Sequence, residues 1–120
     1  MLIFLAEPDP NLRIGLQLLF QQEPGMHVIG MAIQAEGLLI QLKASGADVL
    51  LLEWQLPGTS MKDLLTDIKG LELPPKIVVF SVNPEVESQA ISAGADAFIS
   101  KDGPPDELLE VLRSFKKTVN

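Results

Sequence analysis

The stretch Asp48–Gly58 constrains the fold more than any other part of the sequence. It contains the apolar run Val49-Leu50-Leu51-Leu52 and closes with Pro57-Gly58, a pattern typical of a strand that is buried on both faces. Strands of that kind occur in parallel sheets that helices cover on both sides, so the stretch favours an α/β fold. Glu53 stands where this strand would leave the sheet, and ligands of such folds bind at the carboxyl ends of the strands. Glu53 is therefore the first candidate for a functional residue.

Short apolar runs alternate with amphipathic stretches about five times along the chain. The predicted strands are Leu2–Ala6, Met26–Ala32, Asp48–Leu52, Ile77–Phe80 and Ala97–Ser100. The predicted helices are a first one capped by Asp9 or Asn11 and ending near Gln22, then Gln34–Ala44, Ser60–Lys69 capped by Thr59 or Ser60, Glu85–Ala93, and a last one that Pro104-Pro105 opens and Lys116-Lys117 closes. This alternation predicts an α/β fold of the doubly wound (βα)5 type, with a five-stranded parallel sheet in the flavodoxin-like order 2-1-3-4-5.

The composition indicates a single domain over residues 1–120 and argues against several classes of function. The chain is 47% hydrophobic and 21% charged, carries a formal net charge of -7 and has no cysteine. A phosphate backbone would repel that charge, so we expect no direct nucleic-acid binding by this domain. The lack of cysteine rules out disulfides and thiolate chemistry and fits a cytoplasmic protein. No apolar run approaches the roughly 18 residues of a membrane span, so we expect no membrane partner.

Polar side chains stand at four of the predicted strand ends. Glu7 follows the first strand, Glu53 the third, Ser81 the fourth and Lys101 the fifth. In the order 2-1-3-4-5 these strands are neighbours, so two carboxylates, a hydroxyl and an ammonium group should meet in one shallow cleft. Such a group could hold Mg²⁺, which prefers carboxylate oxygens, or it could be a plain salt-bridge cluster in which Lys101 satisfies Glu53.

The order and spacing of these residues resemble the receiver domain of response regulators over essentially the whole chain. The matching segments are Leu2–Glu7, Arg13–Leu16, Asp48–Gly58, Ser81, Ala93–Phe98 and Lys101. The ending Lys101–Leu108 is similar to receivers that are fused to a C-terminal helix-turn-helix DNA-binding domain.

This resemblance implies a phosphorelay protein of two-component signal transduction. In the family a histidine kinase phosphorylates an aspartate at the end of the third strand, and paired acids after the first strand bind Mg²⁺. The resemblance also implies that Ser81 and Lys101 respond to the phosphoryl oxygens and that Phe98 is an aromatic switch residue.

The sequence departs from the family at the residues that this chemistry needs most. Glu53 stands at the phosphoacceptor position, and the acid pair is occupied by Glu7 and Pro8. A glutamate places its carboxylate one methylene further out, and misplacement of that order costs about 100-fold in rate. Pro8 offers no ligand to Mg²⁺, and Asp9 lies one residue beyond the expected position and is better placed to cap the helix. We therefore expect no cofactor and no metal, with Glu7, Glu53 and Asp9 as the candidate ligands if Mg²⁺ does bind.

Two interpretations of Glu53 remain open. Its carboxylate could mimic the phosphorylated state with a single negative charge, against about -1.5 to -2 for a phosphoryl group. It could instead form a static ion pair with Lys101. Under both interpretations we expect an atypical receiver that works without phosphorylation as a signalling and protein-interaction module in transcription control, and that is not an enzyme.

The expected partners follow from the same resemblance. They are a protein or a second copy bound at the face of the fourth helix, fifth strand and fifth helix, a histidine kinase, and a DNA-binding output domain in a longer protein. One alternative is a conventional receiver that is phosphorylated on Glu53. Another is a flavodoxin-like binder of a small ligand, although the acidic segment Glu7–Pro10 is hostile to a phosphate. The strongly apolar second helix predicts either deep packing or an exposed patch.

Overall fold

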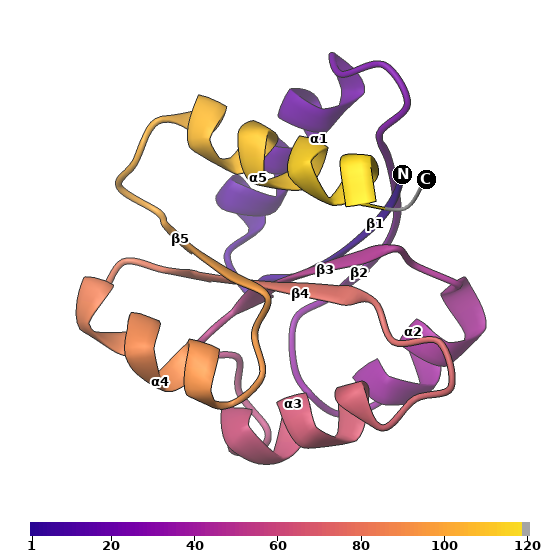
Figure 1. The fold of residues 1–120 in the computed structure, drawn as a ribbon, viewed down its shortest axis with the longest axis vertical. Helices are drawn as coiled ribbons and strands as arrows, with labels where there is room; N and C mark the ends of the chain where they lie inside the picture. The colour runs from indigo at the N-terminus through magenta and orange to yellow at the C-terminus, as the bar shows by residue number, and fades with distance from the viewer. Residues whose placement is uncertain (119–120) are drawn as a thin grey trace.

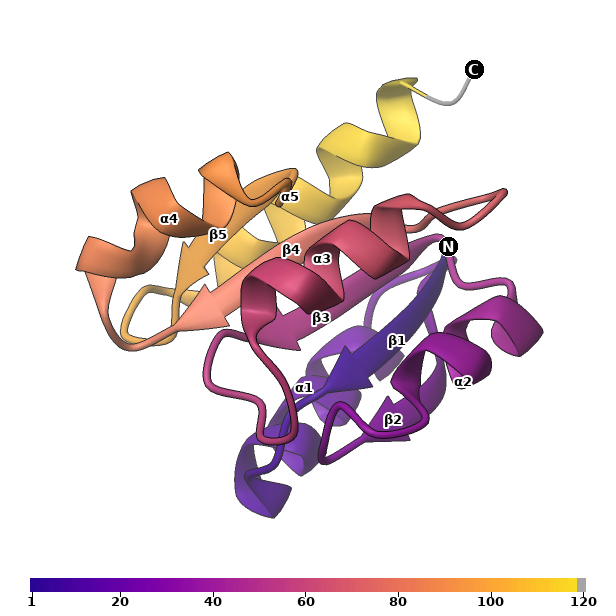
Figure 2. The ribbon, with the colours of Figure 1, turned by 90° about the horizontal axis from the view of Figure 1, so that it is seen from below.

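The computed structural model describes residues 1–118 and contains a five-stranded parallel sheet (Figure 1). Its strands are β1 (Leu2–Ala6), β2 (His27–Ala32), β3 (Val49–Glu53), β4 (Lys76–Ser81) and β5 (Ala97–Ser100). They are arranged in the order β2-β1-β3-β4-β5, and every neighbouring pair is parallel. Figure 2 shows the strands side by side with their carboxyl ends at one edge. The predicted fold class and strand order are confirmed.

Helices cover both faces of this sheet. They are α1 (Pro10–Gln21), α2 (Leu38–Ser45), α3 (Met61–Lys69), α4 (Glu87–Ser92) and α5 (Pro105–Thr118), with a 3-10 turn, η1 (Pro84–Val86), before α4. α1 and α5 lie on one face, and α2, α3 and α4 lie on the other (Figure 1). Every residue of β3 is buried between these layers, which explains why its sequence is an unbroken apolar run and not an alternation.

Two apolar clusters, one on each face, hold the layers together. Successive side chains of a strand point to opposite faces. Leu50 and Leu52 of β3 therefore enter the cluster under α2 and α3, while Val49 and Leu51 enter the cluster under α1 and α5. Full burial of one such side chain contributes about 1.5–3 kcal/mol. Because β3 is anchored in both clusters, the position of Glu53 at its end is well defined.

Local capping residues decide where α1 and α3 begin. Asp9 has an extended backbone, and its carboxylate accepts a hydrogen bond from Asn11 N at 3.0 Å. Asp9, and not Asn11, is therefore the cap of α1. The Ser60 hydroxyl accepts from Asp63 N at 3.1 Å, so Ser60 and not Thr59 caps α3.

Two predicted helices have the wrong bounds. The second begins at Leu38 and not at Gln34, because Gly37 is in the left-handed region with φ of 80° and the preceding loop is tied by Ala35 N to Pro57 O at 2.8 Å. The fourth is shorter than predicted, because its first turn is the 3-10 turn η1.

Smaller differences affect the site and the apolar helix. β3 and β4 each extend one residue further than predicted, so Glu53 and Ser81 are the last residues of strands and not the first residues of loops. For the apolar second helix the sequence predicted either deep packing or an exposed patch, and α2 shows some of each: Leu38 and Leu42 are in the core, whereas Ile40 is 75% exposed. Within residues 1–118, no helix combines the length and the apolar character that a membrane crossing requires.

Gly30 on β2 is required by the close approach of Phe4. A Cβ atom at Gly30 would lie 2.4 Å from Cε2 of the Phe4 ring, which is buried in the core. We expect Gly30→Ala to lower the free energy of unfolding by about 1–3 kcal/mol in urea denaturation, because the ring must move. Gly15→Ala in α1 is the matched control: apart from the adjoining residues and the backbone of its own helix, no atom lies within 4 Å of that Cβ position, so it should raise stability by about 0.5–1 kcal/mol. Equal stability of Gly30→Ala and the parent would contradict this packing.

Candidate functional site

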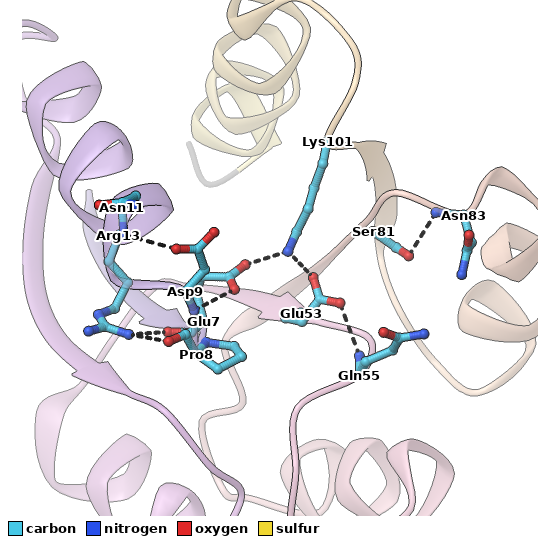
Figure 3. A network of polar contacts seen from close by, with 10 residues as sticks. All are labelled: Glu7, Pro8, Asp9, Asn11, Arg13, Glu53, Gln55, Ser81, Asn83 and Lys101. Carbon is cyan, nitrogen blue, oxygen red and sulfur yellow. Dashed lines mark hydrogen bonds and ion pairs between the residues drawn. The ribbon is translucent and has the colours of Figure 1, made fainter.

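Four polar residues stand at the carboxyl ends of neighbouring strands. Glu7 follows β1, Glu53 ends β3, Ser81 ends β4 and Lys101 follows β5. Glu7, Glu53 and Ser81 are 3%, 7% and 1% exposed, so this edge of the sheet is largely removed from water. The structure brings Glu7, Glu53 and Lys101 into direct contact (Figure 3).

Lys101 bridges the two glutamates. Its Nζ lies 2.7 Å from Glu7 Oε1 and also pairs with Glu53 Oε2, and Figure 3 shows the side chain reaching in from the loop after β5. The Phe80 ring centroid lies 5.6 Å from the same nitrogen and adds a cation–π contact. Two carboxylates share one ammonium group, so the cluster has a formal charge of -1. Each of its charges would cost several kcal/mol to bury without a partner.

The other carboxylate oxygens are bound by backbone N–H groups. Glu7 Oε2 accepts from Asp9 N at 3.0 Å, and Glu53 Oε1 accepts from Gln55 N at 3.2 Å. Each glutamate thus turns one oxygen toward Lys101 and the other toward the loop that follows its own strand (Figure 3). Both carboxylates are held at both of their oxygens.

Arg13 positions the loop that carries Glu7. Its Nη1 donates to the carbonyl oxygens of Glu7 at 2.7 Å and Pro8 at 3.0 Å. This role was missed by the sequence analysis, in which Arg13 appears only within a matching segment. A signal was present, because side chains in the first turns of a helix tilt toward its N-terminus and therefore toward the preceding loop.

Ser81 and Phe98 make separate contacts. The Ser81 hydroxyl oxygen accepts from Asn83 N at 3.1 Å (Figure 3), and the Ser81 carbonyl accepts from Lys101 N at 2.9 Å. Phe98 is half-buried and packs against the apolar cluster under α2, α3 and α4. The switch roles that the family resemblance implies for both residues stay predictions.

The pKa of Lys101 lies above its ordinary value of 10.5. Burial by itself lowers this pKa, but the hydrogen bonds and charges of Glu53 and Glu7 together outweigh burial and raise it. The contacts of the ammonium group therefore stabilise the fold fully below the ordinary pKa. This contribution is lost as the pH rises through the higher pKa of the folded state.

The residues present do not fit the Mg²⁺ site that the receiver resemblance implies. Mg²⁺ demands oxygen ligands in near-octahedral geometry. Lys101 takes one oxygen from each of Glu7 and Glu53, the Pro8 side chain has no oxygen, and the carboxylate of Asp9 caps α1. Among the residues that the structure describes, no group of three or more His, Cys, Asp or Glu side chains is placed to hold a metal ion. The ammonium group of Lys101 lies where a cation between the two glutamates would bind.

Comparisons with known proteins agree on one type of domain. A family model described as the response regulator receiver domain matches residues 3–113. The nitrate/nitrite response regulator NarL of Escherichia coli K12 is 32% identical over 112 residues, which are 92% of this chain and 52% of that protein. NarP of the same strain, also a nitrate/nitrite response regulator, is 26% identical over 117 residues, or 96% of this chain and 54% of NarP. The chain thus spans about half the length of these curated relatives.

A solved structure gives the same result. The signal receiver domain of NarL from Mycobacterium tuberculosis superimposes with a TM-score of 0.84 at 26% identity, covering 96% of this chain and 95% of that one.

Removal of the shared ammonium group should be costly. We expect Lys101→Met to lower the free energy of unfolding at pH 7 by about 3–5 kcal/mol in urea denaturation, because two buried carboxylates lose their counter-charge. Lys69→Met is the matched control. Lys69 pairs with Asp96 at 3.0 Å near the surface, and its loss should cost less than about 1 kcal/mol.

The parent and the Lys101→Met variant also test the raised pKa of Lys101. The stability difference between parent and Lys101→Met should be constant at neutral pH and should shrink above pH 10.5, as the ammonium group of the folded parent loses its proton. A difference that persists unchanged at high pH would contradict this assignment.

Proposed function

The chain belongs to the family of response regulator receiver domains, and we propose that it is an atypical member that transmits a signal through protein contacts without being phosphorylated. The bridge from Lys101 to Glu7 and Glu53 carries this proposal. Phosphoryl transfer depends on an in-line nucleophile and on a metal ion that neutralises charge. Here the carboxylate at the acceptor position is already paired, and a lysine stands between the acids.

The details of the acceptor position support the same proposal. Each carboxylate oxygen of Glu53 already has a partner, Lys101 or Gln55 N, so attack on a phosphodonor would require one of these contacts to be given up. Its extra methylene adds a misplacement that costs about 100-fold. Pro8 replaces one of the two acids expected to bind Mg²⁺, so the metal that would neutralise the transferred group has too few ligands.

Of the two interpretations of Glu53, the contacts favour the static ion pair. Phosphate mimicry requires the carboxylate to engage the lysine and the hydroxyl together. The Ser81 hydroxyl instead accepts from Asn83 N, while Glu53 is bound by Lys101 and Gln55. A single carboxylate charge is also smaller than the charge of about -1.5 to -2 on a phosphoryl group.

The proposed partners are a DNA-binding output domain in a longer protein and other proteins of a signalling pathway. NarL and NarP are named response regulators, and this chain matches only about half of each. We infer that it acts in the control of transcription through a DNA-binding output domain, as a signalling module and not as an enzyme. The face of α4, β5 and α5 is the proposed contact surface, because Ile91 of α4 is 46% exposed. Because the proposed function involves no phosphorylation, the chain would not need a histidine kinase as a partner.

Phosphorylation can be tested directly by intact mass. After incubation with acetyl phosphate and Mg²⁺, the parent should show no phosphoryl adduct. The fluorescence of its single tryptophan, Trp54, should not change when Mg²⁺ is added. The double variant Pro8→Asp, Glu53→Asp restores both acids and is the positive control for the conditions. A stoichiometric adduct on the parent would show that Glu53 is a phosphoacceptor and would overturn the proposal.

Two variants of Glu53 separate a static pair from phosphate mimicry. Glu53→Gln removes the charge, and Glu53→Asp shortens the side chain. For a static pair, both variants should self-associate and bind protein partners like the parent in light scattering. The stability cost of Glu53→Gln should also lie well below the 3–5 kcal/mol expected, roughly, for Lys101→Met, because Lys101 keeps Glu7 as its partner. Weaker association of both variants would instead support mimicry.

A further inference from the structure

The strand β2 lies at the edge of the sheet, and β1 is its only neighbouring strand within residues 1–118 (Figure 2). The outer backbone groups of an edge strand are a template for pairing with another chain, and proteins commonly protect such edges with charged side chains or proline. No Asp, Glu, Lys or Arg stands between Glu23 and Glu36, which is the longest stretch of the chain without these residues, and β2 contains no proline. This edge therefore lacks the usual protective side chains.

Large apolar side chains are exposed at every second position of this edge. Ile29 and Met31 of β2 are 38% and 45% exposed, and Ile33, the first residue after the strand, is 55% exposed. The residues between them are half-buried. Leu5, which lies opposite Met31 in β1, belongs to the apolar cluster under α1 and α5, so Met31 is on the α1 face of the sheet. The monomer thus presents a row of apolar side chains to water along an open edge.

The backbone groups of Met31 point away from the sheet. Ala32 O accepts a hydrogen bond from Glu7 N at 3.0 Å, so the backbone groups of Ala32 face β1. Neighbouring residues of a strand direct their N–H and C=O groups to opposite sides, and those of Met31 therefore face the open edge. The register shift in the pairing of β2 with β1 lies before Gly30, and the pairing is regular from Gly30 to Ala32. A partner strand would meet a regular outer edge around Met31.

The sequence of this edge is symmetric in side-chain size. In Ile29-Gly30-Met31-Ala32-Ile33 the first, third and fifth residues are large and apolar, and the second and fourth are small. If two such segments pair antiparallel about an axis at Met31, each Ile29 lies opposite Ile33 of the other copy, and each Gly30 lies opposite Ala32. The two Met31 residues then exchange both of their backbone hydrogen bonds. A twofold contact requires a surface that is complementary to itself, and this segment meets that requirement.

We propose that β2 is a self-association edge, along which two copies of this chain pair their β2 strands antiparallel and join two five-stranded sheets into one. The charge distribution favours the same occupant. Each copy carries a net charge of -7, so two copies repel over most of their surfaces and approach most easily along an uncharged stretch. A basic partner would find no carboxylate between Glu23 and Glu36. The dimer requires neither phosphorylation of Glu53 nor a contact of α4, so its test is independent of the function proposed above.

Sedimentation equilibrium on the whole chain, from about 10 µM to about 1 mM, measures the dimer. We expect the parent to form dimers within this range. Met31→Lys should raise the dissociation constant at least tenfold, because it places two like charges opposite each other at the axis. The matched control is Ile91→Lys on α4, because Ile91 is 46% exposed against 45% for Met31, and this variant should associate like the parent. Circular dichroism should show the parental fold for both variants.

An exchange of charges tests the register of the pairing. Ile29→Lys and Ile33→Glu should each raise the dissociation constant at least tenfold. The double variant Ile29→Lys, Ile33→Glu places opposite charges across the axis at two positions, so it should dimerise at least fivefold more tightly than either single variant. The double variant Ile29→Lys, Ile91→Glu introduces the same two charges without that pairing and should dimerise no more tightly than Ile29→Lys.

Four results would overturn the proposal. The first is a parent that stays monomeric across the concentration range. The second is a Met31→Lys variant that dimerises as tightly as the parent. The third is a dimer that Ile91→Lys weakens as much as Met31→Lys does, which would place the interface on α4 or make it unspecific. The fourth is a double variant Ile29→Lys, Ile33→Glu that dimerises no more tightly than the single variants, which would exclude the pairing about Met31.

Discussion

A buried charge needs a counter-charge, and in this protein that requirement joins three strands at one lysine. Glu7 after β1 and Glu53 at the end of β3 are both almost fully buried, and Lys101 after β5 pairs with both. The lysine reaches across the end of β4, where it meets the Phe80 ring. The carboxyl edge of the sheet therefore depends on a single ammonium group, and its loss would expose two like charges to each other in a site with little water.

Under the proposed function, the same contact gives this edge of the sheet a structural role in place of a chemical one. In the receiver family this edge holds an acceptor aspartate and a metal-binding acid pair. A longer acidic side chain at position 53 reaches the lysine directly, and a proline at position 8 removes a metal ligand. Both departures are consistent with the proposed function, in which Lys101 meets no phosphoryl group and neutralises the two carboxylates. The frame of the fold is left intact, which is why the overall likeness to receivers stays high.

Under the proposed function, in which Glu53 is not phosphorylated, the signal passes through contacts on the surface of the domain. The exposed apolar residues are distributed over several elements and include Ile14 and Leu18 of α1 and Ile91 of α4. An acidic chain of net charge -7 discourages indiscriminate contact between copies, so uncharged apolar regions stand out as sites of specific contact.

The sequence by itself determined the fold class, the strand order and the departures at the acceptor and acid-pair positions. These follow from features that are local in the chain. The run Val49–Leu52 has to be buried on both faces, and the alternation of strands and helices allows few topologies. Asp9 as a helix cap is likewise a local matter, although the choice between Asp9 and Asn11 needed coordinates.

Only the tertiary structure decided what depends on contacts between distant segments. The start of α2 depends on the hydrogen bond from Ala35 N to Pro57 O. Helix propensity is a local property and does not predict this contact. The sharing of Lys101 by both glutamates depends on distances across three strands. Periodicity determines which residues must be buried, whereas the partner that each one meets is set by the packing of whole elements.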